Sequence, residues 1–511
     1  METTVLFLCA ALSLAIFFLL TSIRQRAHGR KKDGNKLLPP GHPALVFLAK
    51  FLALRRSIFD LGPLLRELHS RHGPVISIRL ARTLVFVADR RLAHRALVQG
   101  GATFADRPPP IDPGLMFNGG AYWRLLRRNL AAEARASFFA PARQRVCDRL
   151  LVNIQSTNSK EDDKESVVTL RPLLRRATFE LLVYMCFGAW LDEEILEEIE
   201  QVQHQILRSV TSFPIFAFFP SITKRIFRRW WAELVAVRRR QDHLFLPLIH
   251  HSSRSKAQDP PPPSCYADSL VKLRLPEEGD RPLTQSELVS LCSEFLNGGT
   301  DTTVTLVEWI MAELVNNPDV QAKLRHELVH GAGGGDELDN NLQEMPYLKA
   351  VVMEGLRLHP PGHFLLPHGV QADSDIGGYT VPKGAELNFL VAEMGRDHTV
   401  WKDPLQFRPE RFLDGGDGCG VDITGSREIK MMPFGVGRHM CPGYALGMHH
   451  AEYFVARMVR DLRWLPPPPP PPPVEVPAPA AAGGGHGRDP GFHNRHEAPA
   501  TCTHPRPSCH K

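Results

Sequence analysis

The most regular hydrophobic pattern in this chain predicts a long helix over residues 284–316. Apolar residues recur there with helical spacing, and Thr284-Gln-Ser-Glu287 has the spacing of a capping box at a helix start. Asn316-Asn-Pro318 ends the pattern, because proline cannot continue a helix. Its middle contains the adjacent glycines Gly298 and Gly299, each of which costs about 1 kcal/mol in a helix. We therefore expect a local opening of the helix there.

Shorter patterns predict elements on both sides of this helix. The stretch Ala121–Asn129 has helical spacing, and Pro346 opens a helix that Pro360-Pro361 closes. Two β-type runs, Pro74–Leu80 and Leu84–Ala88, predict the strands of a hairpin. The expected fold is therefore mainly α-helical with small β-sheets (α+β).

The beginning of the chain predicts a single transmembrane helix. The run Val5–Ile23 is predominantly apolar and, at about 1.5 Å per residue, just spans a bilayer. Arg24, Arg26, Arg30, Lys31 and Lys32 follow it, so the rest of the chain should face the cytosol. A cleaved signal peptide is the alternative, but its basic residues would precede the apolar run. We expect an anchor at residues 1–23 and a basic, proline-rich hinge at 24–45.

The end of the chain has a different composition from the rest. The prolines Pro466–Pro473 are followed by an Ala/Gly/His/Pro-rich segment with almost no large apolar residue. Such a segment buries too little surface to fold. We expect a folded domain at residues 46–465 and a disordered tail at 466–511.

Composition narrows the classes of partner. The chain has 511 residues, 43% hydrophobic and 23% charged, with a net charge of +6. The basic excess forms no long run beyond the N-terminal region, which argues against nucleic acid and fits the surface of an anionic membrane. The nine cysteines have no paired spacing, which predicts reduced thiols and no disulfide framework.

One cysteine lies in a setting suited to metal binding. Cys441 follows a glycine-rich loop and precedes a helical run, and the N–H groups at a helix start favour a thiolate. It has no neighbours at zinc spacing. A single thiolate suits haem iron, which the porphyrin ligates in its plane. The alternative is a buried structural cysteine in a tight turn.

Two further groups of residues carry candidate chemistry. Asp301 and Thr302, beside the paired glycines, can relay protons, although a helix hydroxyl bonded to a backbone carbonyl is the structural alternative. Trp123 and Arg127 share one helix face by their i,i+4 spacing, as a core Trp beside a solvated Arg also would.

The combination of these motifs resembles the cytochrome P450 monooxygenases, most closely the plant microsomal members and in particular the plant family numbered 89. The resemblance covers residues 1–465. Its elements are Phe434-x-x-Gly437-x-x-x-Cys441-x-Gly443, the Gly-x-Asp-Thr motif, Trp123-x-x-x-Arg127, Glu354-x-x-Arg357 and Pro409-Glu-Arg-Phe412.

The resemblance implies a role for each candidate residue. Cys441 would ligate the iron of haem b, and Phe434 and Gly443 of the same loop would also bind the cofactor. Trp123, Arg127, His368 and His439 would hold the haem propionates. Asp301 and Thr302 would deliver protons, and Glu354, Arg357 and Arg411 would form a structural triad.

The resemblance also implies the reaction and its setting. Such an enzyme takes electrons from NADPH through NADPH-cytochrome P450 reductase and inserts one atom of O2 into a small apolar substrate. It would be a single-pass protein of the endoplasmic reticulum membrane, bound to lipid, with its catalytic domain in the cytosol.

Two departures from the family pattern leave other functions open. His439 stands where the family usually has arginine, and the tail replaces the apolar strands that usually finish the chain. A catalytically impaired, haem-binding pseudoenzyme is therefore an alternative. A membrane-anchored scaffold that binds SH3 or WW domains through its polyproline run is another.

Overall fold

The computed structural model describes residues 37–41, 61–79, 83–107, 120–133, 136–158, 167–211, 220–252, 265–331, 338–466 and 508–510. The predicted anchor at residues 1–23 and most of the predicted tail lie outside these ranges. Within the ranges, no helix is both long enough and apolar enough to cross a membrane.

Helices make up most of the described chain, as the sequence predicts. The α-helices are α3 (Gly62–His72), α4 (Arg90–His94), α5 (Gly120–Glu133), α6 (Ala140–Asn158), α7 (Leu170–Phe187), α8 (Glu193–Thr211), α9 (Pro220–Ile226), α10 (Arg228–Ser252), α11 (Tyr266–Lys272), α12 (Gln285–Asn316), α13 (Pro318–His330), α14 (Leu338–Asn341), α15 (Pro346–Leu358), α16 (Val391–Met394) and α17 (Tyr444–Asp461). Short turns of other helix types are η2 (Arg95–Gln99), η4 (Ala136–Phe139), η7 (Pro276–Glu278), η8 (Leu342–Glu344), η9 (Pro409–Phe412) and η10 (Gly437–His439). The predicted helices at 121–129 and from Pro346 are thereby confirmed.

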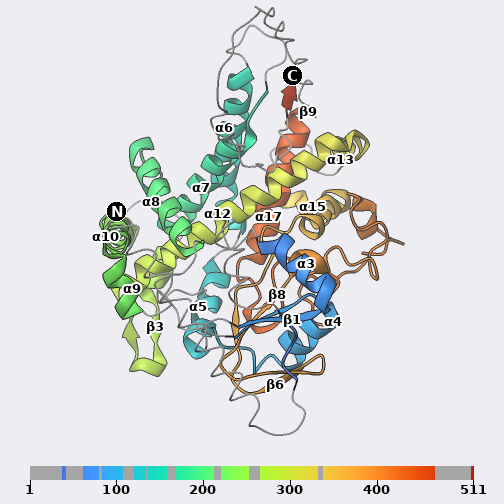
Figure 1. Cartoon of the computed structure of the whole chain (residues 1–511). Helices are drawn as coiled ribbons and strands as arrows, with labels where there is room; N and C mark the ends of the chain where they lie inside the picture. The colour runs from blue at the N-terminus through green and yellow to red at the C-terminus, as the bar shows by residue number, and fades with distance from the viewer. Residues whose placement is uncertain are drawn as a thin grey trace, which may run out of the picture.

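Helix α12 crosses the middle of the molecule, with α6 and α7 above it and most of the strands below it in Figure 1. Its predicted capping box is confirmed: the Thr284 side chain accepts from the Glu287 N–H, and the Glu287 carboxylate accepts from the Thr284 N–H. The predicted opening at the paired glycines is wrong, since α12 runs unbroken through them.

The two glycines have different surroundings that explain why a continuous helix keeps them. A Cβ on Gly299 would lie 2.9 Å from a methyl carbon of Leu182, so its absence lets α7 approach α12 closely. A Cβ on Gly298 would meet nothing within 4 Å. Gly299 therefore serves helix packing, and Gly298 leaves its side of α12 open.

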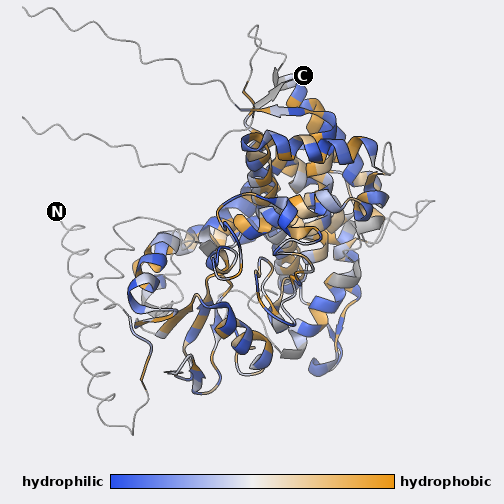
Figure 2. Ribbon diagram, turned by 90° about the vertical axis from the view of Figure 1, so that its right-hand side faces the viewer, coloured by the Kyte–Doolittle hydropathy of each residue, from blue (hydrophilic) through white to orange (hydrophobic). Residues whose placement is uncertain are grey.

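A four-stranded sheet lies apart from the main helices, at the lower left of Figure 2, and its strands are largely hydrophobic. Its order is β1 (Val75–Arg79), β2 (Thr83–Val87), β8 (Glu386–Phe389) and β5 (His368–Gly369). The pair β1–β2 is antiparallel, which confirms the predicted hairpin, while β2–β8 is parallel and β5–β8 antiparallel. Two further strand pairs are β3 (Arg274–Leu275) with β4 (Arg281–Pro282) and β6 (Ser374–Ile376) with β7 (Tyr379–Val381).

Part of the predicted hinge is attached to this sheet. The Ser77 N–H donates to the Pro40 carbonyl at 2.8 Å, and its hydroxyl donates to the Pro39 carbonyl at 2.7 Å. The Thr380 N–H of β7 donates to the Leu37 carbonyl at 3.0 Å. A Cβ on Gly41 would overlap the Ser77 carbonyl, so only glycine fits there. Residues 37–41 thus form a clamp on β1 and β7.

The end of the chain contributes a strand. Strand β10 (Ser508–His510) pairs antiparallel with β9 (Arg463–Leu465), opposing Cys509 to Trp464. For these three residues the expected disorder is wrong, because the open edge of β9 offers backbone groups for pairing. Residues 467–507 lie outside the described ranges, and their disorder stays a prediction.

Candidate active site

The loop before Cys441 is a tight turn that depends on two glycines. Gly435 and Gly437 have φ values of 67° and 72°, which glycine adopts readily. A Cβ on Gly437 would lie 2.3 Å from the Leu97 carbonyl oxygen. The Cys441 N–H donates to the Phe434 carbonyl at 2.8 Å and closes the loop. Cys441 is therefore presented just before α17, with Gly443 as the N-cap of that helix.

Two opposing influences act on the thiol of Cys441. Burial raises its pKa, while a hydrogen bond from the Gly443 backbone and the positive charge of Arg127 act to lower it. Within the described ranges no cluster of three or more His, Cys, Asp or Glu residues could hold a metal ion. A metal held here would have to bring most of its own ligands.

The aromatic ring of Phe434 and the side chains of α5 border the loop. Phe434 meets the Tyr444 ring edge to face, with centroids 6.2 Å apart. Arg127 donates to the Met440 carbonyl, one residue before the cysteine, and its guanidinium lies 5.1 Å from the centre of the Trp123 ring. The Trp123 ring lies 4.6 Å from that of His439. The structure thus brings the predicted Trp123, Arg127 and His439 together beside Cys441.

His368 completes this group from strand β5. Its ring centre lies 5.8 Å from that of His439. Its Nδ1 donates to the Phe104 carbonyl at 2.8 Å, and His439 Nε2 donates to the Ala105 carbonyl at 2.5 Å. Burial lowers the pKa of His368 to about 3 and that of His439 to about 4, and the charge of Arg107 adds to both shifts. A neutral imidazole has a single N–H, and both rings therefore already donate theirs to a backbone carbonyl.

Arg107 is a member of this group that sequence reasoning missed. Its guanidinium donates to the Leu366 and Pro367 carbonyls at 2.8 and 3.0 Å, which places it beside His368. Its buried Nε has no hydrogen-bond partner, and burial lowers its pKa to about 10. In the described part of the chain no carboxylate pairs with it. The only sequence signal is an arginine in Phe104-Ala-Asp-Arg107-Pro, with no helical or strand spacing to mark it.

Asp301 and Thr302 lie on α12, and no hydrogen bond or ion pair among the described residues joins them to the Cys441 loop. Thr302 is exposed, and its hydroxyl donates to the Gly298 carbonyl at 2.6 Å, which is the structural alternative considered for it. The Asp301 carboxylate lies 3.6 Å from Nε of Arg175 on α7. Their catalytic role stays a prediction.

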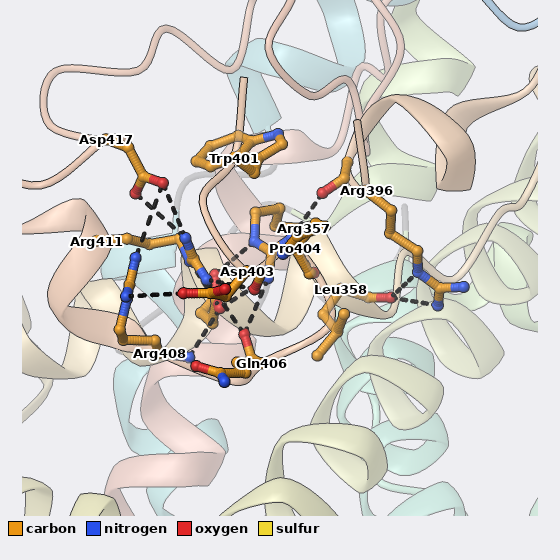
Figure 3. Close-up of polar contacts among 12 residues, drawn as sticks. Arg357, Leu358, Arg396, Trp401, Asp403, Pro404, Gln406, Arg408, Arg411 and Asp417 are labelled. Carbon is orange, nitrogen blue, oxygen red and sulfur yellow. Dashed lines mark hydrogen bonds and ion pairs between the residues drawn. The ribbon is translucent and has the colours of Figure 1, made fainter. Parts of the chain in front are cut away.

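Glu354, Arg357 and Arg411 form a fully buried ion network, and Figure 3 shows the two arginines among their polar partners. Both oxygens of Glu354 accept from Arg357, at 2.7 and 2.8 Å, and one also accepts from Arg411 at 3.0 Å. Other N–H groups of the same two guanidiniums donate to backbone carbonyls of residues 395–406. The Trp401 ring packs against both arginines. The network ties α15 and η9 to the segment that leads toward the Cys441 loop.

Comparisons with known proteins agree with this geometry. The sequence profile of the Cytochrome P450 family matches residues 39–481, which extends past Leu465 into the proline-rich segment. Cytochrome P450 89A9 of Arabidopsis thaliana is 42% identical over 453 residues, covering 84% of this chain and 88% of that protein. A flavonoid 3'-monooxygenase of the same plant is 30% identical over 482 residues, covering 90% of this chain and 91% of that protein.

Solved structures support the same fold. A retinoic acid-bound cyanobacterial CYP120A1 superposes with a TM-score of 0.67 at 21% identity, covering 85% of this chain and 94% of that one. A zebra fish cytochrome P450 with progesterone gives a TM-score of 0.65 at 22% identity, covering 80% and 93%. The comparisons give no support to the pseudoenzyme alternative. This chain belongs to the cytochrome P450 family, is similar to the plant P450s numbered 89, and is a haem-thiolate monooxygenase by that membership.

Proposed function

We propose that this protein inserts one atom of O2 into a small apolar organic substrate, with electrons from NADPH delivered by NADPH-cytochrome P450 reductase. The observation that supports this proposal is the pair of arginines around the Cys441 loop. Arg127 acts on Cys441 and Arg107 acts on His439, and neither arginine has a carboxylate partner among the described residues. Buried or half-buried cations without anions are costly, so the site is built for an anionic ligand.

The residues present fit haem b. Its two propionates would give Arg107 and Arg127 the carboxylates that they lack, and the unpartnered Nε of Arg107 is a free donor for one of them. Trp123 would add its indole N–H. His368 and His439 would donate only in a doubly protonated form, since each ring N–H already serves a carbonyl.

The bound haem would supply O2 activation at an iron ligated by Cys441. The overall reaction takes one O2, two electrons and two protons, puts one oxygen atom into a C–H bond of the substrate and releases the other as water. The chain must therefore move two protons. Thr302 holds a hydroxyl on the open side of α12 beside Gly298, and Asp301 is the adjacent acid. We assign proton delivery to this pair.

The remaining assignments concern the surroundings of the enzyme. Arg124 and Arg128 are exposed on α5 and Arg438 is exposed in η10, so the surface near Cys441 is basic and suits an acidic reductase. The apolar run Val5–Ile23 and the basic residues after it favour a single-pass anchor in the endoplasmic reticulum membrane, with the catalytic domain in the cytosol.

The direct test is the carbon-monoxide difference spectrum of the reduced full-length protein. We expect the strongly red-shifted Soret band of a thiolate ligand, and we expect Cys441→Ala to abolish it. Cys419→Ala is the matched control, because Cys419 is another free cysteine, exposed and outside the loop. A well-expressed wild-type protein without this band would refute the proposal and favour the pseudoenzyme. Once the band is observed, compounds that shift the Soret absorption are identified as ligands and are then tested for turnover.

A further inference from the structure

Asp301 has one ionic partner among the described residues, and that partner is shared. Nε of Arg175 lies 3.6 Å from Oδ1 of Asp301 on α12 and 3.4 Å from Oε1 of Glu200 on α8. It makes a hydrogen bond with neither, although it is buried. One guanidinium N–H thus stands between two carboxylates from different helices.

The two carboxylates differ in how far they depend on Arg175. Glu200 has a second cation, since Arg176 NH1 lies 3.5 Å from its other oxygen. Asp301 has no second cation in the described part of the chain. On the α8 side, His204 Nδ1 accepts from Arg175 NH1 at 3.3 Å and helps to fix the guanidinium. Loss of Arg175 would therefore leave Glu200 paired and Asp301 unpaired.

The helix that carries Arg175 is held tightly against α12. Leu182 of α7 packs onto Gly299, and one turn before Arg175 the guanidinium of Arg171 binds Glu308 at 2.8 Å and the Thr305 hydroxyl at 3.1 Å. The helix position of Arg175 is thus fixed, and only its guanidinium can shift between the carboxylates of Asp301 and Glu200.

We propose that Arg175 is a positioning residue for proton delivery. It holds the Asp301 carboxylate in place for transfer to Thr302, and through Glu200 it makes that placement depend on the position of α8. This inference rests on the proposed function, in which Asp301 supplies protons. When Asp301 is misplaced, O2 still takes up two electrons and two protons but leaves as hydrogen peroxide, without oxygen transfer to the substrate.

The test measures the hydrogen peroxide released per NADPH consumed. The assay contains the full chain, the reductase and one substrate, which is a ligand from the spectral screen that the enzyme turns over. We expect Arg175→Gln to raise this ratio roughly threefold or more, toward that of Asp301→Asn. Arg175→Lys should recover at least part of the coupling, because it restores the charge. Turnover driven by added hydrogen peroxide should stay near wild type in Arg175→Gln, since it bypasses this proton delivery.

Arg171→Gln is the matched control, because it removes an ion pair between the same two helices without touching Asp301. It should leave the peroxide ratio near wild type. The inference is overturned if the peroxide ratio of Arg175→Gln equals that of wild type while Asp301→Asn raises it. It is also overturned if Arg171→Gln raises the ratio as much as Arg175→Gln does. Loss of the thiolate Soret band in the wild-type protein would instead refute the proposed function. If Arg175→Gln does not fold, a wild-type ratio in Arg175→Met would overturn the inference equally.

Discussion

At the residue scale, the hydrogen bonds of His439 determine which other residues must supply positive charge for an anionic ligand beside the Cys441 loop. Its ring N–H is committed to the Ala105 carbonyl, and its Nδ1 is buried without a hydrogen-bond partner. An arginine there would offer several donors and a permanent charge. In this chain the permanent charges that are at least half-buried beside the loop come from Arg107 and Arg127, because Arg438 is exposed.

This arrangement predicts how haem retention responds to mutation. Arg107→Gln should speed haem transfer to apomyoglobin by roughly tenfold, because removing a charge-assisted hydrogen bond costs on the order of 1.5 kcal/mol. Adding His439→Arg to that variant should restore slow transfer by supplying a new cation. Arg438→Gln, at an exposed neighbour, should leave the rate unchanged. Equal haem loss in Arg107→Gln and wild type would show that Arg107 does not hold the cofactor.

A second residue-scale prediction concerns Glu452 on α17. Burial raises its pKa to about 7, and the charge of Lys349 offsets this only in part. Below about pH 4.5 the carboxyl is protonated in both states; between there and pH 7 the unfolded state ionises first, so stability falls as pH rises. Glu452→Gln should therefore raise the unfolding free energy at pH 8 by on the order of 2 kcal/mol and change it little at pH 4.5.

The control for this pH dependence has the opposite sign. Burial acts to raise the pKa of Glu410, but hydrogen bonds from Lys323 and Tyr347 lower it overall. Its carboxylate therefore stabilises the fold above its unfolded pKa, and Glu410→Gln should lower the unfolding midpoint at pH 8 more than at pH 4. Parallel responses of the two variants in pH-dependent thermal melts would contradict at least one of the two assignments.

At the scale of elements, the network around Glu354 joins α15 to η9 through charges that water does not reach. Glu354→Gln would leave the buried Arg357 without a carboxylate partner, while Arg411 keeps its ion pair with Asp417, and we expect a loss of about 3 kcal/mol or more. The measurement is the shift in the thermal unfolding midpoint of the haem-loaded protein. Lys323→Met, which breaks the exposed pair with Glu410, should shift that midpoint little. A small shift for Glu354→Gln would mean that water or rearranged neighbours replace the carboxylate.

The sequence predicted those elements whose signals are local. The capping box of α12, the prolines that frame α15 and the hairpin β1–β2 each depend on residues within a few positions of one another. The parallel pairing of β2 with β8 and the strand β10 join segments far apart in the chain, and no local pattern encodes them. The same holds for the site. Motif spacing predicted Trp123 and Arg127, whereas Arg107 joins the site through a hydrogen bond to a carbonyl 260 positions later, which no local pattern predicts.

At the scale of the whole molecule, the exposed arginines around Cys441 predict how the redox partner binds. The double variant Arg124→Glu/Arg128→Glu should raise the apparent KM for reductase roughly tenfold at low salt, because it reverses the charge of one face of α5. The effect should shrink at high ionic strength. Arg225→Glu/Arg229→Glu, with the same spacing and exposed on α9 and α10, should leave this KM unchanged. Equal effects of both pairs would indicate a response to net charge alone.

The clamp of residues 37–41 on the sheet also determines where the chain can be cut. A shortened chain that begins just before Leu37 keeps both bonds from Ser77 to Pro39 and Pro40, whereas one that begins after Gly41 leaves the Ser77 N–H and hydroxyl without acceptors. For crystallisation without the apolar run Val5–Ile23, the cut therefore belongs on the N-terminal side of Leu37.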